Sequence, residues 1–224
     1  MAHCAHIPAF VLHQVTCQFA TGQTLFGPLN VSLEPSLCGL VGRNGVGKSR
    51  LLRLLAGLDS PAGGHIERAA SIAWVAQQPT LTPETTLATL LGYAPVFDAL
   101  FRLEQGHGLA DDFELLDGHW DLPDRLSLAF RDAGLPAFSA ERPAISLSGG
   151  ERMKALLCGA FVSGADYLLL DEPTNHLDSE GREWLYQQLE NWHGGALIAS
   201  HDRQLLARMP RIIELTPTAL RSYG

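Results

Sequence analysis

The glycine-rich segment Gly42–Ser49 constrains this chain more than any other part of its sequence. It fits the pattern G-x-x-x-x-G-K-S and follows a short apolar run, Leu37–Val41. After it come leucines at helical spacing, so a strand should enter the loop and a helix should leave it: Leu51, Leu52, Leu54 and Leu55. The backbone N–H groups of such a loop and the helix N-terminus attract phosphate oxygens. This strand–loop–helix context makes a purely structural glycine turn the weaker interpretation.

Further strands and helices alternate along the chain. Apolar runs at Ser71–Ala76, Leu168–Leu170 and Ala196–Ala199 predict strands, and Glu180–Trp192 predicts a helix between the last two. This alternation favours an α/β fold built on a parallel sheet. A separate small sheet is predicted from the alternation of Val15, Cys17 and Phe19 and from the segment at 31–33.

Residues 81–145 differ from the rest of the chain in charge. They hold four Arg and no Lys against eleven Asp or Glu, a balance of −7 out of the net charge of −8. Helices are predicted around Leu87–Leu91, from Pro95 to Gly106 and over Leu122–Ala133. We therefore expect an acidic helical subdomain at 81–145, inserted into a core formed by 1–80 and 146–224. Its charge repels nucleic-acid backbones, so no direct DNA binding is expected, and a solvated helical surface is the simplest interpretation.

The remaining composition predicts one globular cytoplasmic domain over 1–224. No apolar run approaches the ~20 residues that a membrane helix needs, and the first residues carry no export signal. The cysteines form no C-x-x-C pair, which is typical of reduced thiols. A group near the N-terminus could be a set of metal ligands, but a polar tail is the favoured interpretation because no second pair follows: His3, Cys4, His6 and His13.

Polar residues follow the predicted strands. Asp171 and Glu172 come directly after the leucine strand, His201 follows the strand at 196–199, and Gln77 follows the strand at 71–76. Open α/β sheets bind ligands at the carboxyl ends of their strands, so these side chains are expected at one edge. A helix-capping role for the two carboxylates is the alternative, and the loop at 42–49 upstream makes it weak.

Ser148–Glu151 has the S-x-x-E spacing of a helix capping box. A helix with one buried face is predicted after it, formed by Met153, Leu156, Leu157, Ala160 and Phe161. Capping alone does not explain Gly149 and Gly150, since glycine costs about 0.5–1 kcal/mol relative to alanine within a helix. Bare backbone at a helix N-terminus suits close approach to phosphate.

Taken in order, the loop, the L-S-G-G-E segment at 147–151 and the L-L-L-D-E-P segment at 168–173 resemble the ATP-binding cassette (ABC) ATPases over nearly the whole chain. The resemblance implies a P-loop core with a small antiparallel sheet and an inserted helical subdomain. It also implies ATP and Mg²⁺ as ligands, and two such cassettes that close on two composite sites. A lone cassette should therefore hydrolyse ATP poorly.

The resemblance assigns roles residue by residue. ATP would be bound by the loop and by an adenine-stacking aromatic: Phe19, Gly42, Arg43, Asn44, Gly45, Val46, Gly47, Lys48 and Ser49. Mg²⁺ would be held by Ser49, Gln77 and Asp171, while Glu172, Gln77 and His201 would act on the attacking water. The ATP of the opposite cassette would be bound by Ser148, Gly149, Gly150 and Glu151, with Asp178 at the seam. A core phenylalanine is the alternative for Phe19. Arg50 stands where the family has Thr or Ser, which puts the α-phosphate contact in question.

The motifs D-E-P-T-N-H-L-D at 171–178 and S-H-D-R at 200–203 are most similar to the ABC-F family, whose members act on the ribosome. Trp120 also resembles the first cassette of that family, whereas Lys154 stands where Arg is usual. ABC-F proteins carry two cassettes joined by a helical linker, so we expect an N-terminal cassette that pairs with a second one or with its own copy. Two alternatives remain: the ATP-binding subunit of a membrane transporter, and an assembly module gated by nucleotide.

Overall fold

A computed structural model of the chain describes residues 7–223. The strands are β1 (Phe10–Gln18), β2 (Thr24–Leu33), β3 (Leu37–Val41), β4 (Gly63–Arg68), β5 (Ile72–Val75), β6 (Tyr167–Asp171), β7 (Gly195–Ala199), β8 (Arg211–Leu215) and β9 (Leu220–Tyr223). The helices are α1 (Lys48–Leu55), α2 (Leu87–Leu91), α3 (Ala94–Glu104), α4 (Ala110–Leu116), α5 (Leu122–Asp132), α6 (Gly149–Phe161), α7 (Ser179–Glu190) and α8 (Arg203–Ala207), with a short 3-10 turn at Ala144–Ser146. None of the helices within 7–223 is long and apolar enough to cross a membrane.

The chain packs as two compact units. The first contains residues up to 77, 164–174 and those from 185 on; the second contains 78–163 and 175–184. All nine described strands belong to the first unit, and helices α2 to α6 belong to the second. The boundaries at 81 and 145 that we drew from composition stay a prediction.

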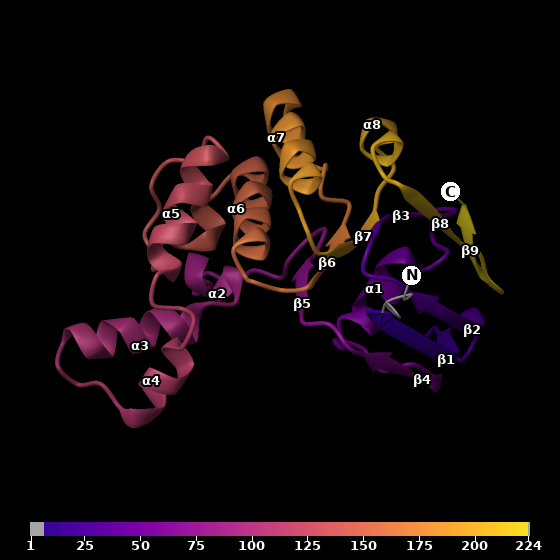
Figure 1. Ribbon diagram of the computed structural model, residues 1–224, viewed down its shortest axis with the longest axis horizontal. Helices are drawn as coiled ribbons and strands as arrows, with labels where there is room; N and C mark the ends of the chain where they lie inside the picture. The colour runs from indigo at the N-terminus through magenta and orange to yellow at the C-terminus, as the bar shows by residue number, and fades with distance from the viewer. Residues whose placement is uncertain (1–6, 224) are drawn as a thin grey trace, which may run out of the picture. The chain divides into compact units, whose positions relative to one another are not determined.

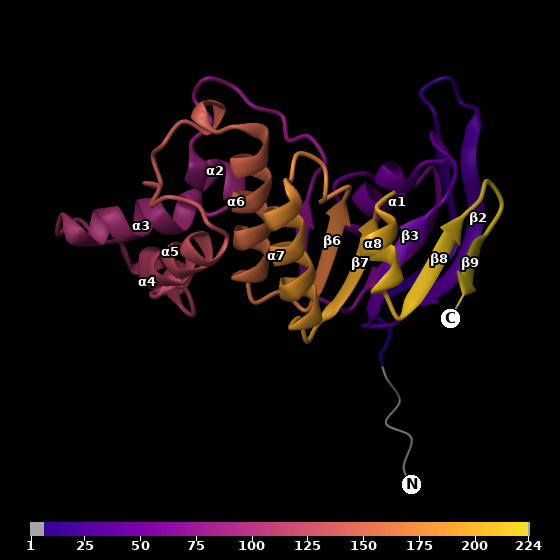
Figure 2. The same cartoon turned by 90° about the horizontal axis from the view of Figure 1, so that it is seen from above.

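The first unit is built on two sheets. The larger has the strand order β5-β6-β7-β3-β8-β9, parallel except for β9, and can be followed from β6 to β9 in Figure 2. The smaller is antiparallel, with the order β2-β1-β4. Helix α1 lies between the sheets and α8 on the other face of the larger one (Figure 1). Every residue of β6 and β7 is buried, as expected for parallel strands covered on both faces.

This arrangement confirms the predicted fold class, an α/β core with a small antiparallel sheet and a helical insertion. One strand boundary was wrong: β1 ends at Gln18, and Phe19 lies in the following turn, where its N–H donates to the carbonyl of Gln23 (2.9 Å). Strands β4, β8 and β9 and helices α4 and α8 were not predicted. In β4 no residue is fully buried, so its sequence lacks the apolar alternation that marks a half-buried strand.

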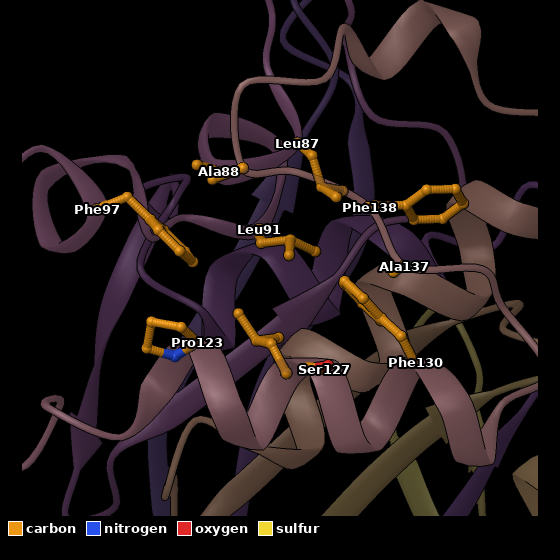
Figure 3. A pocket seen from close by; sticks show the side chains of 11 residues that line it. Leu87, Ala88, Leu91, Phe97, Pro123, Ser127, Phe130, Ala137 and Phe138 are labelled. Atoms are coloured by element: carbon orange, nitrogen blue, oxygen red, sulfur yellow. The ribbon is translucent and has the colours of Figure 1, made fainter. Parts of the chain in front are cut away.

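The second unit packs its helices around a core of its own. Buried apolar side chains from α3, α4, α5 and α6 meet there, among them Ala99, Leu116, Leu126, Phe130 and Cys158. A cavity of about 110 Å³ lies beside this core, and Figure 3 shows Leu87, Leu91 and Phe130 pointing into it. Its lining holds no charged side chain, so this cavity does not suit a phosphate.

A buried hydrogen bond ties α6 to the segment before α3. The hydroxyl of Tyr93 donates to the carbonyl of Gly159 (2.8 Å), and Tyr93 is 9% exposed. Gly159 lies in the last turn of α6, where carbonyls run out of donors within the helix. The Tyr93 hydroxyl therefore satisfies a polar group that burial would otherwise leave without a partner.

Replacing Tyr93 with Phe should lower the free energy of unfolding by about 1–2 kcal/mol, because it removes that donor and leaves the carbonyl buried. Urea denaturation of wild type and variant measures the difference. Tyr223→Phe is the matched control: its hydroxyl bonds Glu214 (3.0 Å) on the surface, and the side chain is 51% exposed. An equal loss in both variants would contradict the assignment.

Candidate functional site

The loop between β3 and α1 is shaped by its glycines. Gly47 has a φ of +105°, and a Cβ there would lie 2.8 Å from Leu25 and 2.9 Å from Phe26. A Cβ on Gly42 would lie 2.6 Å from the carbonyl oxygen of Leu215. The loop therefore packs tightly on β2 and on the end of β8. Gly47 caps α1 without a side-chain hydrogen bond, and the first turn of α1 holds no acidic residue. Its N-terminal N–H groups are thus oriented to bind an anion.

Lys48 folds back over this loop. Its ammonium group donates to the carbonyl of Gly42 (3.0 Å), and its Nζ lies 3.3 Å from Nε2 of His201. The positive charge of Lys48 is therefore held between the loop and the end of β7.

Asp171 and Glu172 lie at the end of β6, beside the loop. Burial raises the pKa of Asp171, against the opposing effects of a hydrogen bond with Ser49 and the charge of Lys48. Burial likewise raises the pKa of Glu172, and the charges of His201 and Lys48 oppose that shift. Glu172 also has a φ of +50°, uncommon for a residue with a side chain. Two carboxylates are thus held, at some energetic cost, where the lysine and the loop meet.

His201 closes the cluster. Its backbone N–H donates to Oε2 of Glu172 (3.3 Å), and its Nε2 lies 3.5 Å from Oε1 of the same carboxylate. The structure therefore brings Lys48, Ser49, Asp171, Glu172 and His201 together. Gln77 lies half-buried two residues beyond β5.

A cavity of about 610 Å³ lies next to the loop. It is lined by Phe19, Thr24, Leu25, Arg43, Asn44, Gly45, Val46, Glu214, Leu215, Thr216 and Pro217. Phe19 is 49% exposed, so it is a wall of this cavity and not a core residue. Its ring is available to stack on a flat aromatic ligand. The sequence did not point to three further lining residues, because strand β8 was not predicted: Glu214, Thr216 and Pro217. The alternation that buries Ile213 and Leu215 is the signal that marks this strand.

Arg50 is occupied elsewhere. Its guanidinium donates to Asp59 (3.0 Å), which also receives two hydrogen bonds from Arg53 (2.8 and 2.9 Å). These partners lower the pKa of Asp59, the hydrogen bond from Arg53 having the largest effect. Arg50 therefore belongs to a surface ion-pair cluster at the end of α1.

The turn at 148–151 lies in the second unit and forms the predicted capping box. Ser148 Oγ accepts from the N–H of Glu151 (3.2 Å), and the Glu151 carboxylate accepts from the N–H of Ser148 (2.8 Å). The glycines have a packing reason that sequence analysis missed: a Cβ on Gly150 would lie 2.9 Å from the carbonyl oxygen of His176, and one on Gly149 3.3 Å from its ring. Their presence alone is thus not specific to phosphate binding.

Helix α6 is also more buried than predicted. Ala155 and Cys158 are fully buried in addition to four of the five predicted residues, whereas Phe161 is only half-buried. Asp178 accepts from the N–H of Gly181 at the start of α7 (2.8 Å). It lies 3.9 Å from Lys154, and its side chain is 69% exposed.

The residues at the edge of the larger sheet fit a nucleotide and Mg²⁺. The loop offers backbone donors, Lys48 offers a cation, and the neighbouring cavity has an exposed aromatic wall. Ser49 and Asp171 present oxygen atoms to each other, and oxygen is the ligand that Mg²⁺ prefers.

Comparison with known proteins gives the same assignment. A family model described as ABC transporter matches residues 27–175. The chain is 34% identical to the energy-dependent translational throttle protein EttA of Mycobacterium tuberculosis, over 94% of this chain and 39% of that protein. It is 37% identical to the probable ATP-binding protein YheS of Escherichia coli, over 83% of this chain and 31% of that protein. The chain thus spans about two fifths or less of the length of these relatives.

Solved structures show the same fold. A dimeric bacterial ABC transporter cassette, MJ0796, matches with a TM-score of 0.74 at 20% identity, over 96% of this chain and 98% of that one. The ATP-binding subunit of an ABC transporter matches with a TM-score of 0.70 at 19% identity, over 96% of this chain and 90% of that one. The chain belongs to the ABC ATPase family, and the relatives that it matches at 34–37% identity, EttA and YheS, are ABC-F proteins.

Proposed function

We propose that this cassette binds MgATP, closes on a second cassette and hydrolyses the ATP, as part of a cytoplasmic ABC-F factor that acts on the ribosome. The cluster of Lys48, Ser49, Asp171, Glu172 and His201 beside the glycine loop carries the proposal. It combines an anion-binding loop with a cation, an oxygen pair suited to a hard metal, and a candidate base.

Each side chain has a task that its surroundings support. Lys48 and the N–H groups of the loop neutralise phosphate charge, and the Phe19 ring stacks on adenine. Ser49, Asp171 and Gln77 hold Mg²⁺, which offsets charge on the phosphate oxygens when bound. Glu172 accepts a proton from the attacking water. The backbone N–H of His201 restrains the Glu172 carboxylate, and the ring of His201 faces the same carboxylate.

The second cassette supplies further contacts to the γ-phosphate. By resemblance to the ABC family, Ser148 to Glu151 bind the γ-phosphate of ATP held by the opposite cassette, and Asp178 lies at the seam between them. The MJ0796 structures support this idea, because one is a dimer and another is a dimer bound to ADP and Pi. The partner is either a second cassette of the same polypeptide or another copy of this chain.

The ribosomal role is supported by the name of EttA, a translational throttle. The acidic segment 81–145 would then face a basic ribosomal protein and not rRNA. A transporter subunit is the competing function, and copurification separates the two: ribosomes support the proposal, whereas a membrane protein overturns it.

Replacing Glu172 with Gln should lower ATP hydrolysis by about 10²–10⁴-fold, since it removes the base while keeping the shape of the side chain. MgATP should then convert the variant from monomer to dimer, and the dimer should persist. Light scattering coupled to size-exclusion chromatography measures the oligomeric state, and phosphate release measures the turnover.

Lys48→Ala is the control for that experiment, because it removes the phosphate contact and should abolish both ATP binding and dimer formation. If Glu172→Gln binds ATP yet wild type and variant keep the same mass with and without it, self-association of this chain is excluded. If the dimer persists and wild-type turnover is absent, closure alone is the output, as in the assembly-module alternative.

The raised pKa of Glu172 predicts a pH-dependent gain in stability for the same variant without nucleotide. The folded state binds the carboxyl proton more tightly than the unfolded state does, so wild type loses stability as pH rises from the ordinary pKa of 4.5 through the raised one. Gln does not titrate. The melting temperature of Glu172→Gln should therefore exceed that of wild type by a margin that grows as pH rises above 4.5 through the raised pKa.

Glu151→Gln is a matched control of opposite sign. The hydrogen bonds with Ser148, that from its backbone N–H first, hold the pKa of Glu151 below 4.5, so wild type gains stability as pH rises through the lowered pKa. The melting temperature of Glu151→Gln should therefore drop below that of wild type as pH rises through the acidic range. Thermal denaturation across the pH series measures both trends, and parallel trends would contradict the assignment of burial as the cause at Glu172.

Reversing Glu114 and Asp117 to Lys should weaken ribosome docking, because the two exposed carboxylates would no longer attract a basic protein surface. Sedimentation with ribosomes at several salt concentrations measures the binding. Glu34→Lys with Glu67→Lys makes the same change in net charge on the first unit and should have a smaller effect. Unchanged or tighter binding of the first double variant would contradict this orientation.

A further inference from the structure

Two histidines and a glutamate meet on the outer face of the three-stranded sheet. His13 of β1 lies directly across from His65 of β4 in the antiparallel register. Glu67 lies two residues further along β4 and so points to the same face as His65. Their side chains are 43%, 67% and 63% exposed, respectively, so an ion can reach them from solvent.

The three side chains converge on one point. Nε2 of His13 lies 3.1 Å from Oε1 of Glu67, and Nε2 of His65 lies 3.8 Å from the same oxygen. The ligand atoms all lie within 4.8 Å of one another. The imidazole rings are stacked, with centroids 4.5 Å apart and an angle of 17° between their planes. Both rings thus present a nitrogen to a single carboxylate.

These separations match the needs of a small divalent ion. Zn–N and Zn–O bonds of about 2.0–2.2 Å in a tetrahedron place neighbouring ligand atoms about 3.3–3.6 Å apart. The two distances to the glutamate oxygen lie on either side of that range, and the stacked rings have to turn toward each other for both nitrogens to face one ion. Two imidazoles and one carboxylate form a ligand set that Zn²⁺ uses in proteins.

The backbone beneath the cluster is fixed by an irregularity in the strand pairing. The register of β1 and β4 shifts after His13, and Gln14 has a φ of +51°. The N–H of Gln14 donates to the side chain of Asn30 (2.9 Å). Gly64, with a φ of +78°, packs so closely on the carbonyl of His13 that no Cβ fits. Bulges of this kind aim a side chain, and here the bulge sets the direction of His13.

We propose that His13, His65 and Glu67 form a site for a borderline divalent transition-metal ion, with Zn²⁺ as the representative. The ion would join β1 to β4, with its remaining coordination positions open to water. The ligand set differs from the oxygen donors proposed for Mg²⁺ at Ser49 and Asp171. A simple surface ion pair explains one histidine against Glu67 but gives no reason for the second imidazole to face the same oxygen.

The sequence pattern groups His13 with three residues that lie outside the described part of the chain: His3, Cys4 and His6. The structure places His13 in a strand with different partners, so the polar-tail interpretation was wrong for this residue. The spacing His65-x-Glu67 in a strand puts both side chains on one face, and this was the available signal.

The test uses the whole chain after treatment with a chelator. Isothermal titration with ZnCl₂ should show one ion per chain, and Co²⁺ in its place should give the visible absorption of a bound ion. Added Zn²⁺ should also raise the melting temperature, since the site exists only in the folded state. Each of His13→Ala, His65→Ala and Glu67→Gln should weaken binding by more than about tenfold, the lower limit for losing even an outer-shell partner.

His107→Ala and His119→Ala are the matched controls, because they remove histidines of the acidic segment and should leave binding unchanged. The combined variant His3→Ala, Cys4→Ala and His6→Ala should also leave binding unchanged, and loss of binding in it would overturn the proposal. The proposal is overturned if His65→Ala binds Zn²⁺ as wild type does, or if wild type shows no saturable binding. Loss of the signal in His65→Ala with retention in both histidine controls supports it.

Discussion

The site depends on the parallel pairing of three buried strands. Strands β3, β6 and β7 run in the same direction with matched registers, Leu40 pairing with Ala199 and Asp171 with Ala199. Because parallel strands end at one edge, the glycine loop, the two carboxylates and His201 emerge side by side although about 150 residues separate the first from the last. The apolar content of these strands buries the sheet, and that burial fixes the positions of the polar groups at its edge.

The same burial makes the site costly to maintain. Asp171 and Glu172 pay a desolvation cost that raises the pKa of each, and Lys48 offsets only part of it. Glu172 adds an unfavourable backbone conformation. A bound cation would give the two carboxylates an opposite charge and offset this cost, which is why such shifts are typical of functional sites.

The sequence predicted the fold where residue pattern and local chemistry agree. The loop at 42–49, the leucine strand before Asp171 and the cap at Ser148 carry their structure in adjacent residues. Prediction failed where the decisive contact is distant in sequence: Gly150 is small because the carbonyl of His176 approaches it, and the partners of His13 lie on β4. We predicted Phe19 as part of a strand, although β1 ends one residue earlier. The alternation of apolar residues continues to Phe19, but the backbone already turns there.

The capping box at the start of α6 holds the turn that is proposed to bind phosphate, and it leaves Ser148 exposed. Ser148 Oγ accepts from the N–H of Glu151, and the Ser148 side chain also hydrogen-bonds the Glu151 carboxylate. Glu151 is turned back to the N–H of Ser148 by the same reciprocal pair, so its negative charge is engaged at the helix start. The close packing of Gly150 on His176 fixes the turn without covering Ser148, which is exposed. A rigid turn binds an anion at lower entropic cost than a flexible one, so the packing that accounts for the glycines also prepares the turn for the role proposed for it.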